Sequence, residues 1–235
     1  MEGTVMRKAM IVAPHPDDAE LAMGGSIAKM IEARWHVLVI DLTDGEPTPF
    51  GSKQIRRSET DKASRILGIT SRICLEMPNR YLQANLENRR KLAEVIRLNV
   101  PDVIFGPLLQ DTHPDHVAAA QLTDAACFEA ALHKTDMKGP PHRVSKRYAY
   151  YSTHRCLHDR PSFIIDITDF WDKKIKAIGA YDSQIKNKNP LDGGPLLEKV
   201  ESTCRYFGQS IGCKYAEPFV AHEPIALKSL DRLLD

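Results

Sequence analysis

The feature that most constrains the fold of this chain is a repeated alternation of short apolar segments with segments of helical spacing. Seven apolar, β-branched runs have the length of short strands: Met10–Pro14, His36–Thr43, Arg72–Met77, Val103–Phe105, Arg147–Thr153, Ser162–Ile167 and Lys214–Ala221. Six further segments carry apolar residues at helical spacing: Ala19–Arg34, Gln54–Leu67, Leu86–Leu98, Val117–Leu132, Phe170–Tyr181 and Leu196–Phe207. Strand followed by helix, four times in succession, predicts an α/β fold with a Rossmann-like, doubly wound and mainly parallel sheet covered by helices on both faces.

The length of 235 residues suits one large α/β domain better than two small ones. Folding can bury roughly 70 % of the surface of such a chain, so a core forms without disulfides or a structural metal. We predict a single domain over residues 1–235, in which residues 7–133 form the core and residues 147–235 complete the substrate site. Lys134–Lys146 and Asn187–Pro195 carry Pro and Gly punctuation and are expected to be loops.

The charge balance and the cysteines limit the partners and the compartment. Thirty-two basic against 31 acidic residues leave a net charge of +1, which gives no bulk electrostatic reason to bind nucleic acid or an anionic membrane. We find no signal peptide and no apolar run of about 18 residues, so no membrane span is expected. Five widely spaced cysteines favour a reducing compartment, and we expect a cytoplasmic protein: Cys74, Cys127, Cys156, Cys204 and Cys213.

The first polar motif, His15-Pro16-Asp17-Asp18-Ala19-Glu20, stands where the first predicted strand ends and the first helix begins. Two carboxylates and an imidazole have no packing reason to gather at the end of a core strand, because buried carboxylates are costly unless they are paired or bound to a cation. The alternative interpretation is an N-capping aspartate with polar surface neighbours.

The second polar motif, Asp111-Thr112-His113-Pro114-Asp115-His116, again follows a strand and precedes a helix. Ligands of a doubly wound sheet bind beyond the carboxyl ends of the strands, at the switch point where the first and fourth strands are neighbours. The two motifs follow these two strands. We therefore expect segments about a hundred residues apart in sequence to meet in space.

Within each motif the outer residues stand three apart, which places them on one side of a first helical turn. His15 and Asp18 can thus converge with His113 and His116. Two imidazoles and one carboxylate with an open position for water are typical of catalytic zinc, which makes hydroxide available at neutral pH. Spacing alone does not select the three ligands among these groups.

These motifs resemble the hallmark of the LmbE-like, or PIG-L, zinc-dependent de-N-acetylases, an A-H-P-D-D-x-E segment and a downstream H-P-D-H. The resemblance covers most of the chain, because it extends through Leu42–Glu46, Arg56–Gly68, Ser162–Asp166 and Tyr215–Phe219. The later stretches are similar to the branch that deacetylates N-acetylglucosaminyl malate in bacillithiol synthesis. One departure is visible, since Pro14 stands where the family usually has alanine.

By matched position, the resemblance implies that His15, Asp18 and His116 hold the metal. The metal implied is Zn²⁺, with Fe²⁺ as the alternative. The resemblance also implies that Asp17 is the general base that accepts a proton from the attacking water. We therefore expect Asp17→Asn to keep the metal and to lose nearly all turnover.

Further roles are implied for residues around this group. His113 would steady the oxyanion or protonate the leaving amine, and Asp115 would orient it. Tyr215 would place its hydroxyl near the developing oxyanion. Arg56 occupies a substrate-binding position, and Glu46 follows a glycine at the end of a strand where it could touch a sugar hydroxyl.

The activity implied by the resemblance is removal of the acetyl group from an N-acetylglucosamine unit of a small glycoconjugate. The candidate substrates are N-acetylglucosaminyl malate, chitobiose and N-acetylglucosamine itself. Arg56 and the Lys134–Lys146 loop would accommodate a carboxylate such as malate. Relatives are often hexamers or trimers, so we expect a homo-oligomer.

Three other functions compete with this interpretation. Two histidines and one carboxylate also form the facial triad of non-haem Fe(II) oxygenases, but such a site does not need Asp17 and His113. A non-catalytic sugar-binding protein with a relict metal site does not need them either. Gly208-Gln209-Ser210-Ile211-Gly212 matches the G-x-S-x-G motif of serine hydrolases. However, a helix-like segment precedes this serine and a strand-like one follows it, the reverse of the required context.

Overall fold

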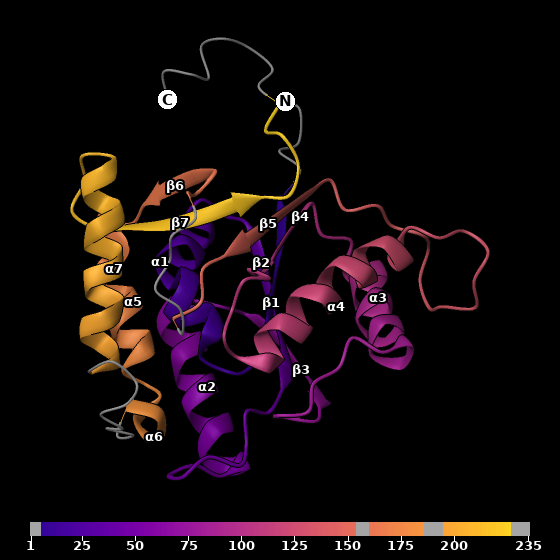
Figure 1. Ribbon diagram of the computed structural model, residues 1–235, viewed down its shortest axis with the longest axis horizontal. Helices are drawn as coiled ribbons and strands as arrows, with labels where there is room; N and C mark the ends of the chain where they lie inside the picture. Colours follow the sequence, from indigo (N-terminus) through magenta and orange to yellow (C-terminus); the bar gives the residue numbers. More distant parts are fainter. Residues whose placement is uncertain (1–5, 154–159, 186–194, 227–235) are drawn as a thin grey trace.

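A computed structural model describes residues 6–153, 160–185 and 195–226, and seven strands of these ranges form one sheet of order β3-β2-β1-β4-β5-β7-β6 (Figure 1). The strands are β1 Lys8–Ala13, β2 His36–Thr43, β3 Ser71–Met77, β4 Val103–Pro107, β5 Lys146–Tyr150, β6 Phe163–Asp166 and β7 Ala216–Ala221. β1 to β5 pair in parallel, and β7 runs antiparallel to both β5 and β6. This topology confirms the predicted mainly parallel α/β fold.

The predicted helices all form, with ends that shift by a few residues. They are α1 Asp18–Glu32, α2 Lys53–Leu67, α3 Leu86–Asn99, α4 Pro114–Ala130, α5 Trp171–Ile178 and α7 Leu196–Ser210. A 3-10 turn at Thr168–Phe170 precedes α5, and the short helix α6, Asp182–Ile185, was not predicted. Gly68 ends α2 in the left-handed conformation, with a φ of 88°, and thus acts as the stop signal read from the sequence.

The core consists of two apolar layers, one on each face of the sheet. Side chains of β1 alternate between them, with Ala9, Ile11 and Ala13 on one face and Met10 and Val12 on the other. The first layer is closed by α1, α2 and α5, and the second by α3 and α4, which pack against each other. Helices on both faces leave the carboxyl ends of the strands as the open edge of the sheet (Figure 1).

Helix α1 is kinked at Met23, whose φ of −141° and ψ of 26° are not helical. After the kink, the backbone N–H groups of Gly25 and Ser26 donate to the carboxylate of Glu217 on β7, over 3.0 and 2.7 Å. Lys174 of α5 donates to the same carboxylate over 2.6 Å, and Lys174 and Glu217 are fully buried. The carboxylate of Glu217 on β7 thus caps the N-terminus of the second half of α1.

The segment predicted as the loop Lys134–Lys146 follows α4 and is anchored by Arg97 of α3. Arg97 is 2 % exposed, and its guanidinium donates to the backbone oxygens of Ala130, Met137 and Gly139 over 3.0, 3.4 and 3.3 Å. The other predicted loop, Asn187–Pro195, lies outside the described residues except for Pro195, as does Cys156. The four cysteines that the structure describes are free thiols: Cys74, Cys127, Cys204 and Cys213.

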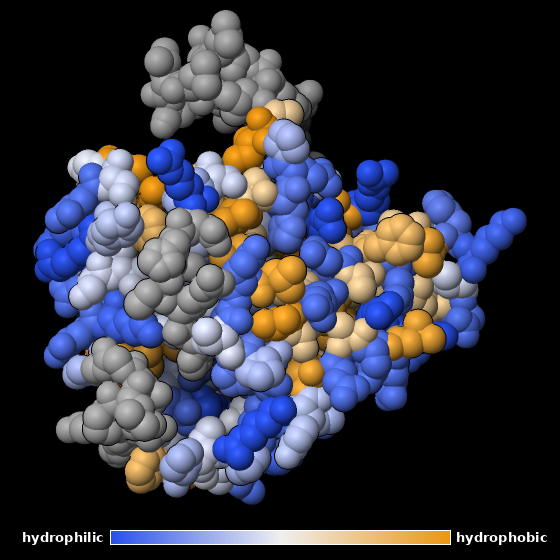
Figure 2. Space-filling view, viewed as in Figure 1, coloured by the Kyte–Doolittle hydropathy of each residue, from blue (hydrophilic) through white to orange (hydrophobic). Residues whose placement is uncertain are grey.

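The face of the molecule in Figure 2 is mostly hydrophilic, with apolar side chains gathered over α4. Phe128 of α4 is one of the most exposed apolar residues, at 70 %. None of the helices in the described ranges is both long and apolar enough to cross a membrane.

Candidate metal centre

The two polar motifs lie side by side at the carboxyl edge of the sheet. β1 and β4 are parallel neighbours, with Ile11 paired to Phe105, so the segments that follow them leave the sheet together. His15 and Asp18 come from the turn between β1 and α1, and His116 comes from the first turn of α4. The predicted meeting of these segments is therefore present in the structure.

Among the described residues, one group with metal-ligating atoms within 4.8 Å of one another consists of His15, Asp18 and His116. Asp18 Oδ2 is the common point. It lies 3.1 Å from His15 Nδ1 and 3.3 Å from His116 Nε2. These are the residue types and the separations of two imidazoles and a carboxylate that share a tetrahedral ion.

In each imidazole, the ring nitrogen that does not face Asp18 contacts a second carboxylate. His15 Nε2 lies 3.0 Å from Asp115 Oδ2, and His116 Nδ1 lies 2.8 Å from Asp111 Oδ2. Metal-ligating histidines commonly donate their other N–H to such a carboxylate, which fixes the ring and strengthens it as a ligand. Because both imidazoles have this support, the residues present fit a divalent metal ion.

Both outer carboxylates are themselves held by the backbone. Asp115 accepts from the N–H groups of Arg80 and Leu82 over 2.7 and 3.2 Å. Asp111 accepts from the N–H of His113 over 2.9 Å and from the hydroxyl of Ser152. These bonds place the supporting groups independently of the imidazoles, which preorganises the site.

A second group within the same limit contains His15, His113 and Asp115. In this group, one ring nitrogen of His113 already has a partner, because His113 Nδ1 accepts a hydrogen bond from the backbone N–H of Asp115 over 3.2 Å. A nitrogen that accepts cannot carry a proton, so the neutral ring has its proton on Nε2. His113 also packs against His116, with ring centroids 4.8 Å apart. The Nε2–H of His113 is therefore a hydrogen-bond donor beside the group that contains His116.

Four carboxylates crowd around the two imidazoles: Asp17, Asp18, Asp111 and Asp115. Burial by itself lowers the pKa of His15, but Asp115 and Asp18 raise it to about 9. Burial likewise lowers the pKa of His116, and Asp18 and Asp111 raise it to about 10. Carboxylates in such excess over basic side chains are the environment that a divalent cation neutralises.

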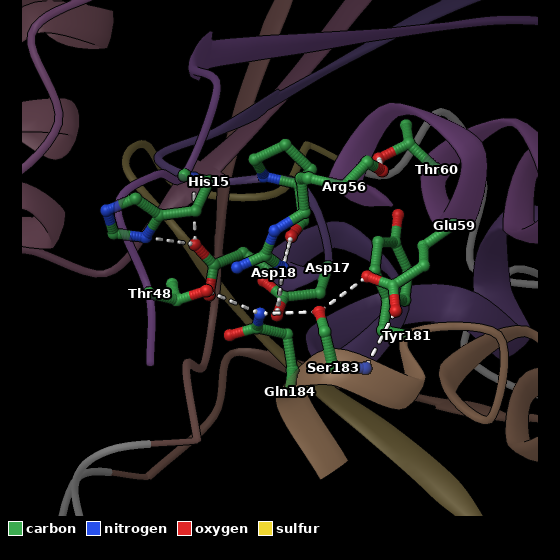
Figure 3. A network of polar contacts seen from close by, with 12 residues as sticks. His15, Asp17, Asp18, Thr48, Arg56, Glu59, Thr60, Tyr181, Ser183 and Gln184 are labelled. Atoms are coloured by element: carbon green, nitrogen blue, oxygen red, sulfur yellow. Dashed lines mark hydrogen bonds and ion pairs between the residues drawn. The ribbon is translucent and has the colours of Figure 1, made fainter. Parts of the chain in front are cut away.

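Asp17 has an unusual backbone and a committed side chain. It is the residue before α1, with a left-handed φ of 115°, and in the described part of the chain its carboxylate makes no capping hydrogen bond. The carboxylate instead accepts from Arg56 over 3.1 Å (Figure 3). Burial raises the pKa of Asp17 to about 7 although Arg56 opposes this. Backbone strain with a diverted side chain is typical of a functional residue, and it contradicts the capping interpretation.

Arg56 and Glu46, which were predicted to bind substrate, bind each other. Arg56 is 4 % exposed, and its Nε donates to Glu46 over 3.4 Å while its Nη1 donates to the oxygen of Pro16 over 2.8 Å. Glu46 also accepts from the backbone and the hydroxyl of Thr48, each over 2.8 Å. Glu46 and the oxygen of Pro16 thus fix the guanidinium of Arg56, which in turn fixes the carboxylate of Asp17. Contact of Arg56 or Glu46 with a substrate stays a prediction.

The contacts of Thr48 continue into the unpredicted helix α6. Gln184 donates to Thr48 Oγ1 over 3.2 Å, and Ser183 donates from its N–H and its hydroxyl to Glu59 of α2 over 2.7 and 2.8 Å (Figure 3). Arg56 lies one helical turn before Glu59. The short helix therefore braces the helix that carries Arg56.

Tyr215 lies elsewhere. Its ring stacks on Trp171 with centroids 4.0 Å apart, and its hydroxyl contacts Glu201 and Arg205 of α7 over 3.2 and 3.0 Å. None of its described contacts is with the group of His15, Asp18 and His116. The structure thus does not bring this hydroxyl to the position that the resemblance implied.

Sequence reasoning assigned no role to Asp111 or Ser152. The signal for Asp111 was available, because it stands at the start of the second motif, five residues before His116. No pattern marked Ser152, since it follows the end of β5 and reaches Asp111 only through the pairing of β5 with β4.

Comparison with known proteins identifies the family. Residues 10–127 match the model of the PIG-L family, described as GlcNAc-PI de-N-acetylase. The chain belongs to the PIG-L family. The matched range includes every residue of the candidate metal centre except Ser152.

Curated relatives of the chain include enzymes of two kinds. The chain is 30 % identical to diacetylchitobiose deacetylase of Thermococcus kodakarensis over 228 residues, which cover 90 % of this chain and 82 % of the relative. It is 26 % identical to a probable N-acetyl-alpha-D-glucosaminyl L-malate deacetylase of Bacillus anthracis, over 77 % of this chain and 83 % of the relative. A 4-oxalmesaconate hydratase of Pseudomonas putida is 28 % identical over 74 % of this chain and 73 % of the relative.

Solved structures of the PIG-L fold match closely. The conserved protein TT1542 from Thermus thermophilus is 38 % identical with a TM-score of 0.87, over 96 % of this chain and 99 % of that chain. N,N'-diacetylchitobiose deacetylase from Pyrococcus horikoshii is 28 % identical with a TM-score of 0.78, over 92 % of this chain and 84 % of that chain.

Proposed function

We propose that this protein is a zinc-dependent hydrolase that removes the acetyl group from an N-acetylglucosamine unit of a small glycoconjugate. The observation that carries the proposal is the group of His15, Asp18 and His116 with Asp17 beside it, in a PIG-L family chain that has deacetylases among its relatives. The family and the deacetylases among the relatives support an amide hydrolase, and the choice of metal and the roles of single residues are the proposal.

His15, Asp18 and His116 would hold the metal ion. When bound, a divalent cation acts as a Lewis acid and lowers the pKa of a water molecule so that hydroxide forms near neutral pH. Asp17 is the residue next to Asp18 and would accept the proton of the attacking water. Arg56 holds the carboxylate of Asp17 at one oxygen, which leaves the other available.

His113, from the second motif, would supply a hydrogen-bond donor to the substrate. Its Nε2–H, fixed by the backbone bond at Nδ1, would donate to the oxygen that becomes negative or to the nitrogen that leaves as an amine. Asp115 serves two partners, since its N–H fixes His113 and its carboxylate fixes His15. Base and donor would thus come from different strand ends and approach an amide from two sides.

The compartment and the substrate are two further parts of the proposal. Four free cysteines suit a reducing compartment, and we propose the cytoplasm. Candidate substrates remain N-acetylglucosaminyl malate, diacetylchitobiose and N-acetylglucosamine, because relatives include deacetylases for the first two.

The test measures free amine with fluorescamine after incubation with each candidate substrate, with and without a chelator. We expect amine release that the chelator abolishes and that added Zn²⁺ restores. Activity without oxygen separates hydrolysis from an Fe(II) oxygenase, which would be inactive. An absence of amine from every substrate, together with metal-dependent hydration of 4-oxalmesaconate, would overturn the proposal in favour of the hydratase activity named for one relative.

A further inference from the structure

A cavity of about 590 Å³ lies between α7, the first half of α1 and the segment that follows β5. This volume falls within the range of roughly 300–1,000 Å³ that is usual for small-molecule sites. α7 stands beside α5 and α1 in the region where β7 crosses (Figure 1). β5 is parallel to β4, so the residues after β5 emerge at the same edge of the sheet as the candidate metal centre.

The cavity and the metal centre share a wall. Ser152 lines the cavity, and its hydroxyl donates to Asp111, which in turn contacts His116. From the other side, Leu21 lines the cavity and follows Asp18 by one helical turn. The cavity therefore borders the metal centre at Ser152 and at Leu21.

Three aromatic side chains line the cavity. The rings of Tyr151 and Phe207 are 6.0 Å apart, and those of Tyr206 and Phe207 are 5.1 Å apart in a T-shaped arrangement. Tyr151 and Phe207 are buried, whereas Tyr206 is 66 % exposed. Four serine and threonine residues also line the cavity: Ser152, Thr153, Ser202 and Thr203. Aromatic faces together with hydroxyls recognise the C–H faces and the hydroxyls of a sugar ring.

The charges of the wall disfavour an anionic occupant. Lys199 is the one basic residue among the described residues that line it, and Glu198 and Glu217 are acidic. The carboxylate of Glu217 is already paired with Lys174 over 2.6 Å. A dicarboxylate such as malate needs a surplus of basic donors, which the described residues of this wall do not offer.

We propose that this cavity binds the second, uncharged sugar ring of an N-acetylglucosamine disaccharide whose acetyl group lies at the metal centre. The inference rests on the proposed function and narrows its substrate from three candidates to one class. Stacking on the rings of Tyr151, Tyr206 or Phe207 and hydrogen bonds to the wall hydroxyls would supply the preference for a disaccharide over the monosaccharide.

The catalytic test compares kcat/KM for diacetylchitobiose with kcat/KM for N-acetylglucosamine. Thr203→Trp fills the cavity, and we expect it to lower the ratio of the two constants about tenfold or more. Gln209→Trp is the matched control on α7, at an exposed position outside the cavity, and should leave the ratio unchanged. Tyr206→Ala removes an exposed ring and tests the same point without crowding the core, with the exposed Phe128→Ala as its control.

A binding measurement separates this inference from the proposed function. Saturation-transfer NMR with the zinc-loaded protein detects diacetylchitobiose and N-acetylglucosamine even if neither is hydrolysed. Stronger binding of the disaccharide that Thr203→Trp abolishes supports the cavity whatever the activity. If the wild type binds or turns over both sugars alike, or if N-acetylglucosaminyl malate is preferred over diacetylchitobiose, the inference is overturned while the deacetylase function stands.

Discussion

Replacing Asp111 by asparagine is expected to weaken metal binding without unfolding the protein. Asp111 contacts His116 Nδ1 over 2.8 Å and also accepts from the N–H of His113 and from Ser152. Asparagine has nearly the same shape and keeps an oxygen that accepts hydrogen bonds, so the geometry survives. The variant removes the negative charge that strengthens His116 as a ligand.

The expected loss of zinc affinity is moderate, because Asp111 supports the ligand His116 and is not itself a proposed ligand. Loss of a carboxylate that supports a ligating histidine typically lowers metal affinity 10- to 100-fold. At about 1.4 kcal/mol for each factor of ten, this corresponds to roughly 1.4–2.8 kcal/mol of binding free energy. Removal of a ligand itself would cost far more, so the magnitude distinguishes the supporting role from direct coordination.

Affinity is measured by competition between the protein and a chromophoric zinc chelator, with kcat determined at saturating Zn²⁺. We expect a 10- to 100-fold higher dissociation constant and a kcat that recovers in large part when zinc is in excess. Asp124→Asn is the control. Asp124 lies on α4, as His116 does, but its carboxylate is partly exposed and pairs with Arg147 over 3.4 Å. An unchanged zinc affinity in Asp111→Asn would refute the reasoning.

Three further outcomes are expected. Asp17→Asn should bind zinc as the wild type does and lose nearly all turnover, since asparagine tolerates the left-handed φ but cannot accept a proton; an active, zinc-loaded variant would rule out the base assignment. Lys174→Met should lower the free energy of unfolding in urea by about 3–5 kcal/mol, because it leaves Glu217 buried without its cation; adding Glu217→Gln should recover part of the loss, and equal losses in the single and double variants would argue against the pairing. Arg97→Met should destabilise the protein, because it frees buried carbonyl groups around the 134–146 loop, and should leave zinc affinity unchanged, which the chelator assay checks.

The sheet core and the meeting of the two motifs could be predicted because both depend on local patterns. β2 coincides with the predicted His36–Thr43, since its apolar run is bounded on both sides by polar residues. Proximity of the motifs followed from parallel strands whose carboxyl ends share one edge, and the i, i+3 spacing supplied the convergence of His15 with Asp18.

The rest depends on information that sequence periodicity does not contain. The direction of β7, antiparallel between β5 and β6, is set by long-range pairing and leaves no local mark. A four-residue helix such as α6 is too short to show a helical period. The hydroxyl of Tyr215 points to α7 because the ring stacks on Trp171, a contact between residues 44 positions apart.

The carboxylate of Glu217 has a consequence for how the chain is made. It satisfies the N–H groups of Gly25 and Ser26, which precede it by 192 and 191 positions. During translation these groups emerge from the ribosome long before their acceptor, so the second half of α1 lacks this carboxylate until residue 217 has been made. A chain truncated before residue 217 would lack this acceptor, and we expect its first helix to be cleaved more readily in limited proteolysis.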